Sequence, residues 1–245
     1  MAIFDICEIT STTFTATISS LRGVFSSNHV IQNSDIAAVK ARFIVFEGID
    51  GSGKSTQARL LAEKLRAEGQ AVHLTCEPTG SPIGVMIRDI FKGKMKADHT
   101  TIAGLFLADR LHHITDEEDG LLHHLKQGTT VISDRYYFSS YAYHSVHMSL
   151  DWVIAANSLC AQLLRPDAHI FLDMTPEDAM ARIQQNRPGT ELYETLENLE
   201  AVRKQYQAAF SLLDTREVIY SLPANQPAAA LALQIRQLVT EKLGI

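Results

Sequence analysis

The chain has 245 residues, of which 46% are apolar and 20% are charged, and its formal charge at pH 7 is -6. This length allows one sizeable α/β domain with its own core and excludes two large ones. The negative charge offers no general attraction for nucleic acid or anionic membranes, and charged residues interrupt every apolar run before the roughly 18 residues of a membrane span, so we expect a soluble protein with neither partner.

Residues 1–40 are rich in Ser and Thr and show no sustained hydrophobic period of a helix or a strand. We interpret them as a poorly ordered extension. A transit peptide would explain the hydroxyl residues, but Asp5 and Glu8 lie near the start, and Arg22 is the only arginine before Arg42. Transit peptides are basic and poor in acidic residues, which disfavours that alternative.

From residue 41 to the C-terminus, short β-branched or aromatic runs alternate with longer helical patterns. Buried strands are predicted at residues 43–46, 71–75, 130–133, 168–172 and 217–220. Helices are predicted at residues 58–65, 83–91, 100–114, 117–127, 150–164, 176–185, 191–213 and 227–243. This alternation is typical of βαβ units and predicts an α/β fold in three layers, with a parallel five-stranded sheet covered by helices on both faces.

A phosphate-binding loop follows the first predicted strand and opens the first helix. Its residues are Gly48, Ile49, Asp50, Gly51, Ser52, Gly53, Lys54 and Ser55, followed by Thr56. They match the pattern G-x-x-x-x-G-K-[ST], in which backbone N–H groups and the lysine hold phosphates and the Ser hydroxyl can coordinate Mg²⁺. The loop therefore predicts a fold of the P-loop NTPase type that binds a nucleoside triphosphate. It does not identify the acceptor, because switches, motors and small-molecule kinases share it.

Asp50 is an acidic residue inside a loop that is built to hold anions. Such a charge costs electrostatic energy beside phosphates, so we expect Asp50 to face another group, such as a sugar hydroxyl or an amine. The alternative interpretation is a tolerated surface Asp.

Two further elements follow the second and third predicted strands, at the edge where ligands gather in open α/β sheets. They are Glu77-Pro78 and Asp134-Arg135. Asp134 can bind Mg²⁺ or orient an acceptor, and Arg135 can bridge donor and acceptor phosphates through bidentate contacts. A structural salt bridge between Asp134 and Arg135 is the alternative.

Two pairs of residues in helical segments complete the candidate site. Phe106 and Arg110 are four residues apart and share a helix face, so they can stack on a base and bond its edge, or simply pack on each other. Arg182 and Arg187 flank a loop at residues 186–190, and arginines there can close over a triphosphate as a lid at residues 182–195. Exposed helix-end arginines are the simpler alternative.

Cysteine spacing gives no sign of a disulfide framework, because Cys7, Cys76 and Cys160 are odd in number and far apart. This indicates a reducing compartment, and we expect a cytoplasmic location.

Histidine occurs in two adjacent pairs, at residues 112–113 and 123–124. Adjacent residues point to different sides of a helix, and no Cys or carboxylate pattern completes a metal site. We interpret both pairs as solvated helix residues.

Taken together, these residues resemble the thymidylate kinase family from about residue 42 to the C-terminus. The matching segments are residues 46–57, Glu77-Pro78, residues 106–110, Asp134-Arg135-Tyr136 and residues 171–173. The resemblance implies phosphoryl transfer from ATP to thymidine monophosphate with Mg²⁺, and a homodimer with the helix around Trp152 and Leu159 as a candidate contact.

The resemblance also implies roles for individual residues. Asp50 would hold the deoxyribose 3′ hydroxyl, Phe106 would stack on thymine, Arg110 would contact the edge of the base, and Arg135 would bind the acceptor phosphate. Ser139, Ser140 and Tyr143 would line the pocket for base and sugar, where Tyr143 disfavours a ribose 2′ hydroxyl.

The chain departs from the family pattern at several positions. Gly51 stands where one branch places a catalytic arginine, which implies that Arg182 and Arg187 supply that charge instead. Cys76 replaces an arginine often found before Glu-Pro, and Leu192 stands where some members carry a lid arginine.

Two rival functions are also compatible with these sequence features. One is another nucleoside or nucleoside monophosphate kinase, which shares the phosphate loop and an Asp-Arg element. The other is a nucleotide-dependent switch or binding module, which needs no second anion site.

Overall fold

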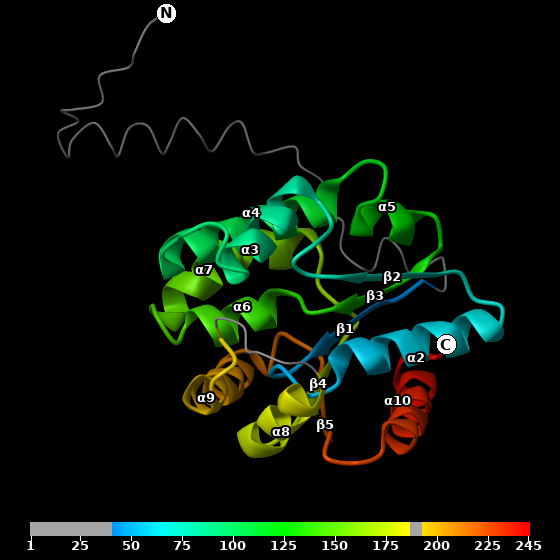
Figure 1. Cartoon of the computed structure of the whole chain (residues 1–245). Coiled ribbons are helices and arrows are strands. Elements are labelled where there is room, and N and C mark those ends of the chain that lie inside the picture. Colours follow the sequence, from blue (N-terminus) through cyan, green and yellow to red (C-terminus); the bar gives the residue numbers. More distant parts are fainter. Residues whose placement is uncertain (1–40, 187–192) are drawn as a thin grey trace, which may run out of the picture. The chain divides into compact units, whose positions relative to one another are not determined.

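A computed structural model describes residues 41–186 and 193–245 (Figure 1). In chain order the elements are β1 (Phe43–Glu47), α2 (Lys54–Ala67), β2 (Val72–Cys76), α3 (Pro82–Phe91), α4 (His99–Thr115), α5 (Leu121–Lys126), β3 (Thr130–Asp134), α6 (Tyr137–His144), α7 (Leu150–Leu163), β4 (Ala168–Asp173), α8 (Pro176–Asn186), α9 (Leu196–Leu213), β5 (Ile219–Pro223) and α10 (Ala228–Leu243). The predicted extension at residues 1–40 lies outside the described residues, and so do Arg187 and Leu192 of the predicted lid.

The strands form a five-stranded sheet in the order β2-β3-β1-β4-β5, and all neighbouring strands are parallel. The central strand β1 pairs with β3 on one side and β4 on the other, with Ile44 opposite Ile132 and Ala168. Every residue of β1 is buried, as a continuous apolar run predicts for a strand covered on both faces. The predicted parallel sheet is confirmed.

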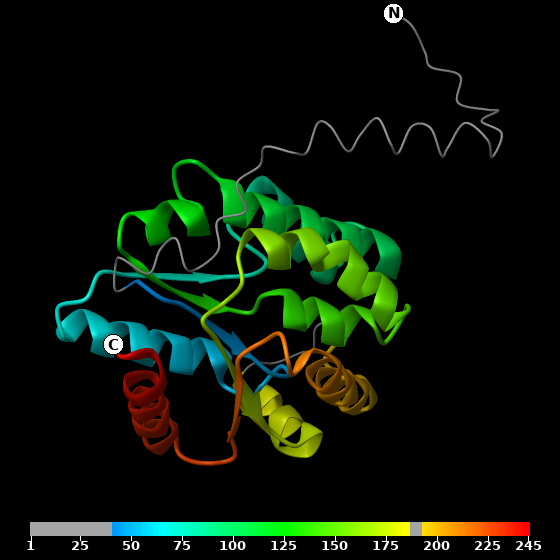
Figure 2. The same ribbon diagram turned by 180° about the vertical axis from the view of Figure 1, so that it is seen from behind.

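Helices cover both faces of this sheet (Figure 1 and Figure 2). On one face α2 packs against α10, and on the other α4 packs against α3, α5 and α7. The apolar residues of α2 at helical spacing, Ala58, Leu61, Ala62 and Leu65, are all buried. The predicted three-layer fold is therefore confirmed. Among residues 41–186 and 193–245, every helix is too short or too polar to cross a membrane.

Three helices differ from the predicted pattern. The sequence does not predict α6, because all of its residues are buried and no polar face reveals a helical period. The helix predicted at 117–127 is limited to α5, since Asp116 accepts backbone N–H bonds from Glu118 and Asp119 in a turn. The helix predicted at 191–213 becomes α9, whose first turn is capped by the Thr195 hydroxyl.

Candidate active site

The loop between β1 and α2 has the backbone conformation that phosphate binding requires. Gly51 and Gly53 have φ angles of 81° and 95°, in the left-handed region that glycine adopts without a steric penalty. A Cβ atom at Gly51 would lie 2.4 Å from the carbonyl oxygen of Ala179, so any side chain there would collide with the backbone of α8. Gly53 is also the N-cap of α2, and a helix N-terminus favours a bound anion.

Lys54 lies inside this loop rather than on its surface. Its side chain is buried, and Nζ donates a hydrogen bond to the carbonyl oxygen of Ile49 at 2.9 Å. Burial, followed by the positive charge of Arg135, lowers the pKa of Lys54 to about 8. The charged form of this lysine is therefore poorly stabilised until an anion enters the loop.

Ser55 and Asp134 come together although they are far apart in the sequence. The Ser55 hydroxyl donates a hydrogen bond to Asp134 Oδ2. The other carboxylate oxygen, Asp134 Oδ1, is buried and has no hydrogen-bond partner among the described residues. A hydroxyl oxygen beside an unpaired carboxylate oxygen is a hard donor set, and it fits Mg²⁺.

The Asp50 carboxylate is paired with two residues from outside the phosphate loop. Its Oδ1 accepts a hydrogen bond from Arg135 Nη2, and its Oδ2 accepts one from the Tyr143 hydroxyl at 2.9 Å. Burial alone would raise the pKa of Asp50, but the charges of Arg135 and Lys54 lower it below its ordinary value. The carboxylate is thus ionised and directed at Arg135 and Tyr143.

Arg135 reaches Asp50 from the end of β3. Its φ of 80° lies in the left-handed region, which non-glycine residues adopt rarely and mainly at functional sites. Its Nη1 donates to the Ser139 hydroxyl at 3.1 Å. Among the described residues Arg135 is therefore paired with Asp50, and the predicted alternative of a salt bridge to Asp134 is not formed.

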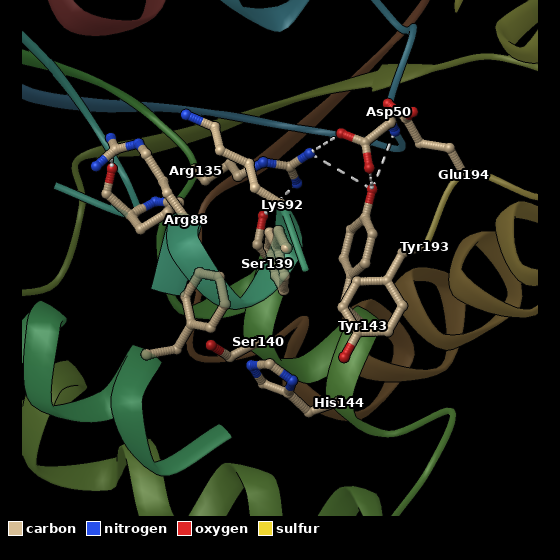
Figure 3. A pocket seen from close by; sticks show the side chains of 13 residues that line it. Asp50, Arg88, Lys92, Arg135, Ser139, Ser140, Tyr143, His144, Tyr193 and Glu194 are labelled. Carbon is tan, nitrogen blue, oxygen red and sulfur yellow. Dashed lines mark hydrogen bonds and ion pairs between the residues drawn. The ribbon is translucent and has the colours of Figure 1, made fainter. Parts of the chain in front are cut away.

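A cavity of about 240 Å³ lies beside the phosphate loop (Figure 3). Its lining includes Pro78 of the Glu77-Pro78 element and six of the residues that the resemblance assigns to the acceptor, namely Asp50, Phe106, Arg135, Ser139, Ser140 and Tyr143. Figure 3 shows Asp50, Arg135 and Tyr143 joined by hydrogen bonds on one wall, with Ser140 and His144 near the opposite end. The phosphate loop and this cavity share Asp50.

Glu77 and Arg110 lie behind the cavity wall instead of lining it. Arg110 is 1% exposed. Its N–H groups donate to the Glu77 carboxylate at 2.7 and 2.9 Å, to Ser140 Oγ at 2.9 Å, and to acceptors on Asn157 and Tyr136. Each N–H of the Arg110 guanidinium therefore has an acceptor among the described residues, and none is left for the predicted direct contact of Arg110 with a base. Arg110 binds Ser140 from behind the wall, and Glu77 binds Arg110.

His113 also belongs to this buried network. Its Nδ1 lies 3.1 Å from Glu77 Oε1, and its Nε2 lies 2.9 Å from the Thr75 hydroxyl. The prediction that His113 is a solvated helix residue is therefore wrong. The pattern could not show this, because the Glu77 partner comes from a different element.

The cavity has further lining residues that the sequence patterns did not single out. They are Arg88, Phe91, Lys92, His144, Tyr193 and Glu194. Arg88 donates hydrogen bonds to the carbonyl oxygens of Pro78 and Thr79. The spacing of Arg88 and Lys92, four residues apart just after the Glu77-Pro78 element, is the signal that could have indicated a second anion site.

His144 stands out among the unexpected residues. It is 3% exposed, its ring centroid lies 5.2 Å from that of Phe106, and its Nδ1 has no hydrogen-bond partner among the described residues. Burial lowers the pKa of His144 to about 3, so its imidazole is neutral at physiological pH. A neutral ring with a free nitrogen beside an aromatic wall suits a planar, polar ligand.

Glu47 positions the cavity wall from the core. This buried carboxylate precedes the phosphate loop and accepts hydrogen bonds from Ser139 Oγ at 2.6 Å, the Tyr206 hydroxyl at 2.9 Å and the Tyr136 N–H at 3.0 Å. A charged residue at the end of an otherwise apolar strand was the available signal for this role.

Of the two predicted lid arginines, Arg182 is the one that the structure describes. Its Nη2 donates to the carbonyl oxygen of Ala224 at 2.9 Å. Its Nη1 lies 3.8 Å from the position of a Cβ built on Gly53, which places the guanidinium next to the phosphate loop. The description of the chain resumes at Tyr193. The Tyr193 hydroxyl lies 3.2 Å from His99 Nδ1, and the Tyr193 ring packs edge-on against Phe91.

The site combines a loop that binds the phosphates of a nucleotide with an adjacent cavity, and the Asp50 carboxylate belongs to both. This arrangement defines the chain as an ATP-dependent nucleoside monophosphate kinase of the P-loop class. A model of the family described as thymidylate kinase matches residues 46–235. The chain therefore belongs to the thymidylate kinase family, and the resemblance seen in the sequence is confirmed.

Relatives from three organisms agree with this assignment. A probable thymidylate kinase from Pyrococcus horikoshii is 37% identical over 190 residues, which covers 75% of this chain and 90% of that protein. One from Methanococcus aeolicus is 40% identical over 166 residues, covering 67% and 77%. One from Thermococcus kodakarensis is 37% identical over 190 residues, covering 74% and 89%.

Proposed function

We propose that this chain transfers the γ-phosphoryl group of ATP to thymidine monophosphate, giving ADP and thymidine diphosphate. The observation that carries the proposal is the position of Asp50, which belongs to the phosphate loop and is bonded to Arg135 and Tyr143 of the adjacent cavity. A switch or binding module needs the loop but not a second site joined to it in this way.

On the donor side, the loop residues 48–56 hold the triphosphate, and Lys54 contacts its β and γ phosphates. Ser55 and Asp134 are the residues that would hold Mg²⁺, which when bound neutralises charge on the phosphate oxygens. Arg182 lies next to the loop and stabilises charge that develops on the transferred group. Arg187 is proposed to act with it.

On the acceptor side, Phe106 stacks on the thymine base. Ser140 and His144 present polar atoms to its edge, while Arg110 and Glu77 fix Ser140 in place. Asp50 accepts a hydrogen bond from the 3′ hydroxyl of the sugar, and the ring of Tyr143 fills the space that a 2′ hydroxyl would need.

The acceptor phosphate is bound by guanidinium and ammonium groups that converge on the cavity. Arg135 reaches it from the end of β3, and Arg88 and Lys92 approach from α3. Arginine suits this position because its planar fork binds phosphate bidentately. Catalysis then consists mainly of positioning the two nucleotides in line and neutralising charge between them.

We further propose a homodimer formed through α7. Trp152 and Leu159 on this helix are 47% and 50% exposed, while Val153 and Cys160 on its other face are buried. Large apolar side chains left in water favour association. Sedimentation equilibrium should give twice the monomer mass, and Trp152→Glu with Leu159→Glu should shift the protein to monomers.

We propose that the protein works in the cytoplasm. Cys76 and Cys160 are both free thiols in the described part of the chain, as expected in a reducing compartment. Fractionation of the native cells, with the protein detected by antibody, tests this location.

The substrate assignment is tested with a panel of acceptors in a coupled ATP assay. We expect the largest kcat/KM for dTMP, a lower value for dUMP, and only traces for UMP and thymidine. A preference for UMP would indicate a ribonucleotide kinase, and a preference for thymidine would indicate a nucleoside kinase. ATP turnover unaffected by all four acceptors would contradict a kinase of this class.

A further inference from the structure

A second cluster of chemically active side chains lies at the other end of the sheet from the phosphate loop. His73 is near the start of the edge strand β2, Asp119 lies in the turn before α5, and His124 is on α5. One nitrogen or oxygen atom from each of the three residues lies within 4.8 Å of the other two. Among the residues that the structure describes, this is the group of His, Cys, Asp and Glu whose atoms converge as metal ligands do.

The three side chains are already in mutual contact. His124 Nε2 lies 2.8 Å from Asp119 Oδ1, and His73 Nδ1 lies 4.0 Å from the same oxygen. The two imidazole rings stack with centroids 3.8 Å apart and an angle of 18° between their planes. One nitrogen of each ring therefore lies near the same carboxylate oxygen, although the two rings come from different elements.

A surface ion pair between His124 and Asp119 would explain only part of this arrangement. It does not account for the His73 ring, which stacks on the His124 ring with its Nδ1 4.0 Å from Asp119 Oδ1. Two neutral imidazoles and a carboxylate, by contrast, are a common ligand set for zinc and related ions. The helix α5 and strand β2 would then be joined by a shared ion.

We propose that His73, Asp119 and His124 bind a divalent transition-metal ion, zinc in particular. Three protein ligands leave a fourth position for water. Mg²⁺ is excluded by its preference for an octahedral shell of oxygen ligands, so this site is chemically distinct from the Ser55 and Asp134 pair. The ion fastens α5 and its preceding turn to the edge of the sheet.

Small side-chain movements suffice to complete the site. The stacked rings must turn about χ2 to direct their nitrogens at one point, and this torsion of His is soft. Asp119 is 78% exposed, so its carboxylate is free to move toward the ion. The turn that carries it is fixed by the hydrogen bonds from the Glu118 and Asp119 N–H groups to Asp116.

The test uses the full chain without an affinity tag, titrated with Zn²⁺ by calorimetry and with Co²⁺ by visible absorption. We expect one high-affinity ion per chain, a d–d spectrum of a four-coordinate site with Co²⁺, and a Tm increase of about 5 °C at saturating Zn²⁺. Excess Mg²⁺ should not displace the ion.

Variants locate the ion among the histidines of the chain. His73→Ala, His124→Ala and Asp119→Asn should each weaken Zn²⁺ binding by at least about tenfold and abolish the Tm increase. Asp119→Asn changes an exposed side chain and keeps its shape, so it reports on binding even if a histidine variant folds poorly. His123→Ala is the matched control, because the His123 ring bonds to Gln127, and it should bind Zn²⁺ as the wild type does.

Two results would overturn the proposal. One is a wild-type chain that binds no Zn²⁺ or Co²⁺ above the background of unspecific sites. The other is wild-type affinity in Asp119→Asn and His124→Ala, which would place the ion elsewhere. Neither result bears on phosphoryl transfer, because none of the three residues lies in the candidate active site.

Discussion

The hydroxyl of Tyr143 donates a hydrogen bond to Asp50 Oδ2 at 2.9 Å and accepts one from the Asp50 backbone N–H at 3.0 Å. This double contact fixes the acceptor cavity to the phosphate loop, because the two residues belong to α6 and to the loop after β1. The donor and acceptor sites are therefore joined directly through this pair of residues.

Two substitutions of Tyr143 separate its hydroxyl from its ring. Tyr143→Ala should raise the kcat/KM for UMP relative to dUMP by roughly tenfold to a hundredfold, because the ring no longer occupies the space of a 2′ hydroxyl. Tyr143→Phe keeps the ring and should preserve this discrimination, while losing about tenfold in kcat/KM for dTMP through the missing hydrogen bond. Unchanged discrimination in Tyr143→Ala would contradict the steric role.

The depressed pKa of Lys54 predicts a pH dependence of ATP binding. In the free protein this pKa is about 8, and the bound triphosphate raises it by favouring the charged form. ATP binding therefore takes up a proton between the two pKa values. With Mg²⁺ saturating, the Kd for ATP should be constant below about pH 7 and rise by up to about tenfold per pH unit above pH 8.

Calorimetry in two buffers of different ionisation enthalpy measures this proton uptake directly. Lys54→Arg provides the comparison, because its guanidinium stays protonated throughout the range, and its Kd should not change between pH 7 and 9.5. A wild-type Kd that is equally flat would show that Lys54 is already fully charged in the free loop.

The close approach of Gly51 to α8 predicts a large cost for any side chain at this position. Gly51→Ala places a Cβ 2.4 Å from the Ala179 carbonyl oxygen and also imposes an unfavourable φ. Gly69→Ala is the matched control, since Gly69 has a φ of 85° but no atom within 4 Å of its Cβ position. The control should lower the free energy of unfolding by about 1 kcal/mol.

Gly51→Ala should lower the free energy of unfolding by clearly more than Gly69→Ala does, as measured by urea unfolding. It should also reduce kcat in the coupled assay. Equal losses of unfolding free energy in Gly51→Ala and Gly69→Ala would mean that α8 moves away from the new side chain without loss of stability. The same contact gives a physical reason for the absence of an arginine in this loop and for the proposed use of Arg182.

The buried ion pair behind the cavity predicts a contrast between two glutamates. Glu77→Gln leaves Arg110 charged and incompletely paired in the core, which should cost about 3 to 5 kcal/mol of unfolding free energy. Glu63→Gln removes a partner of Arg59 at 2.8 Å, but both of these side chains are more than half exposed, so the cost should stay below about 1 kcal/mol. Comparable values in urea unfolding would contradict the view that Glu77 compensates the buried charge of Arg110.

The phosphate loop can be recognised from the sequence because its residues are contiguous. The phosphate loop is a local pattern, and the charge of Asp50 within it already indicates a partner other than phosphate. The five strands are equally clear, since each is a short apolar run between turn residues.

The acceptor side is harder to predict because it is assembled from separate elements. The spacing of Phe106 and Arg110 indicates that they share a helix face, but it does not show how deeply each side chain is buried. Only the packing shows that Arg110 is bonded to Glu77 behind the cavity wall. His144 lies in a helix buried on all sides, where the sequence has no polar period to reveal it. The contact between His73 and His124 joins a strand to a distant helix and leaves no local signal.

Transfer of labelled phosphate to thymidine monophosphate is the direct test of the proposed kinase activity. With ATP labelled at the γ position and dTMP as acceptor, the purified protein should place the label on thymidine diphosphate. Lys54→Ala should abolish this transfer while dTMP still binds, as measured by calorimetry. Label that appears only as inorganic phosphate, or a Lys54→Ala variant with wild-type rates, would contradict the account.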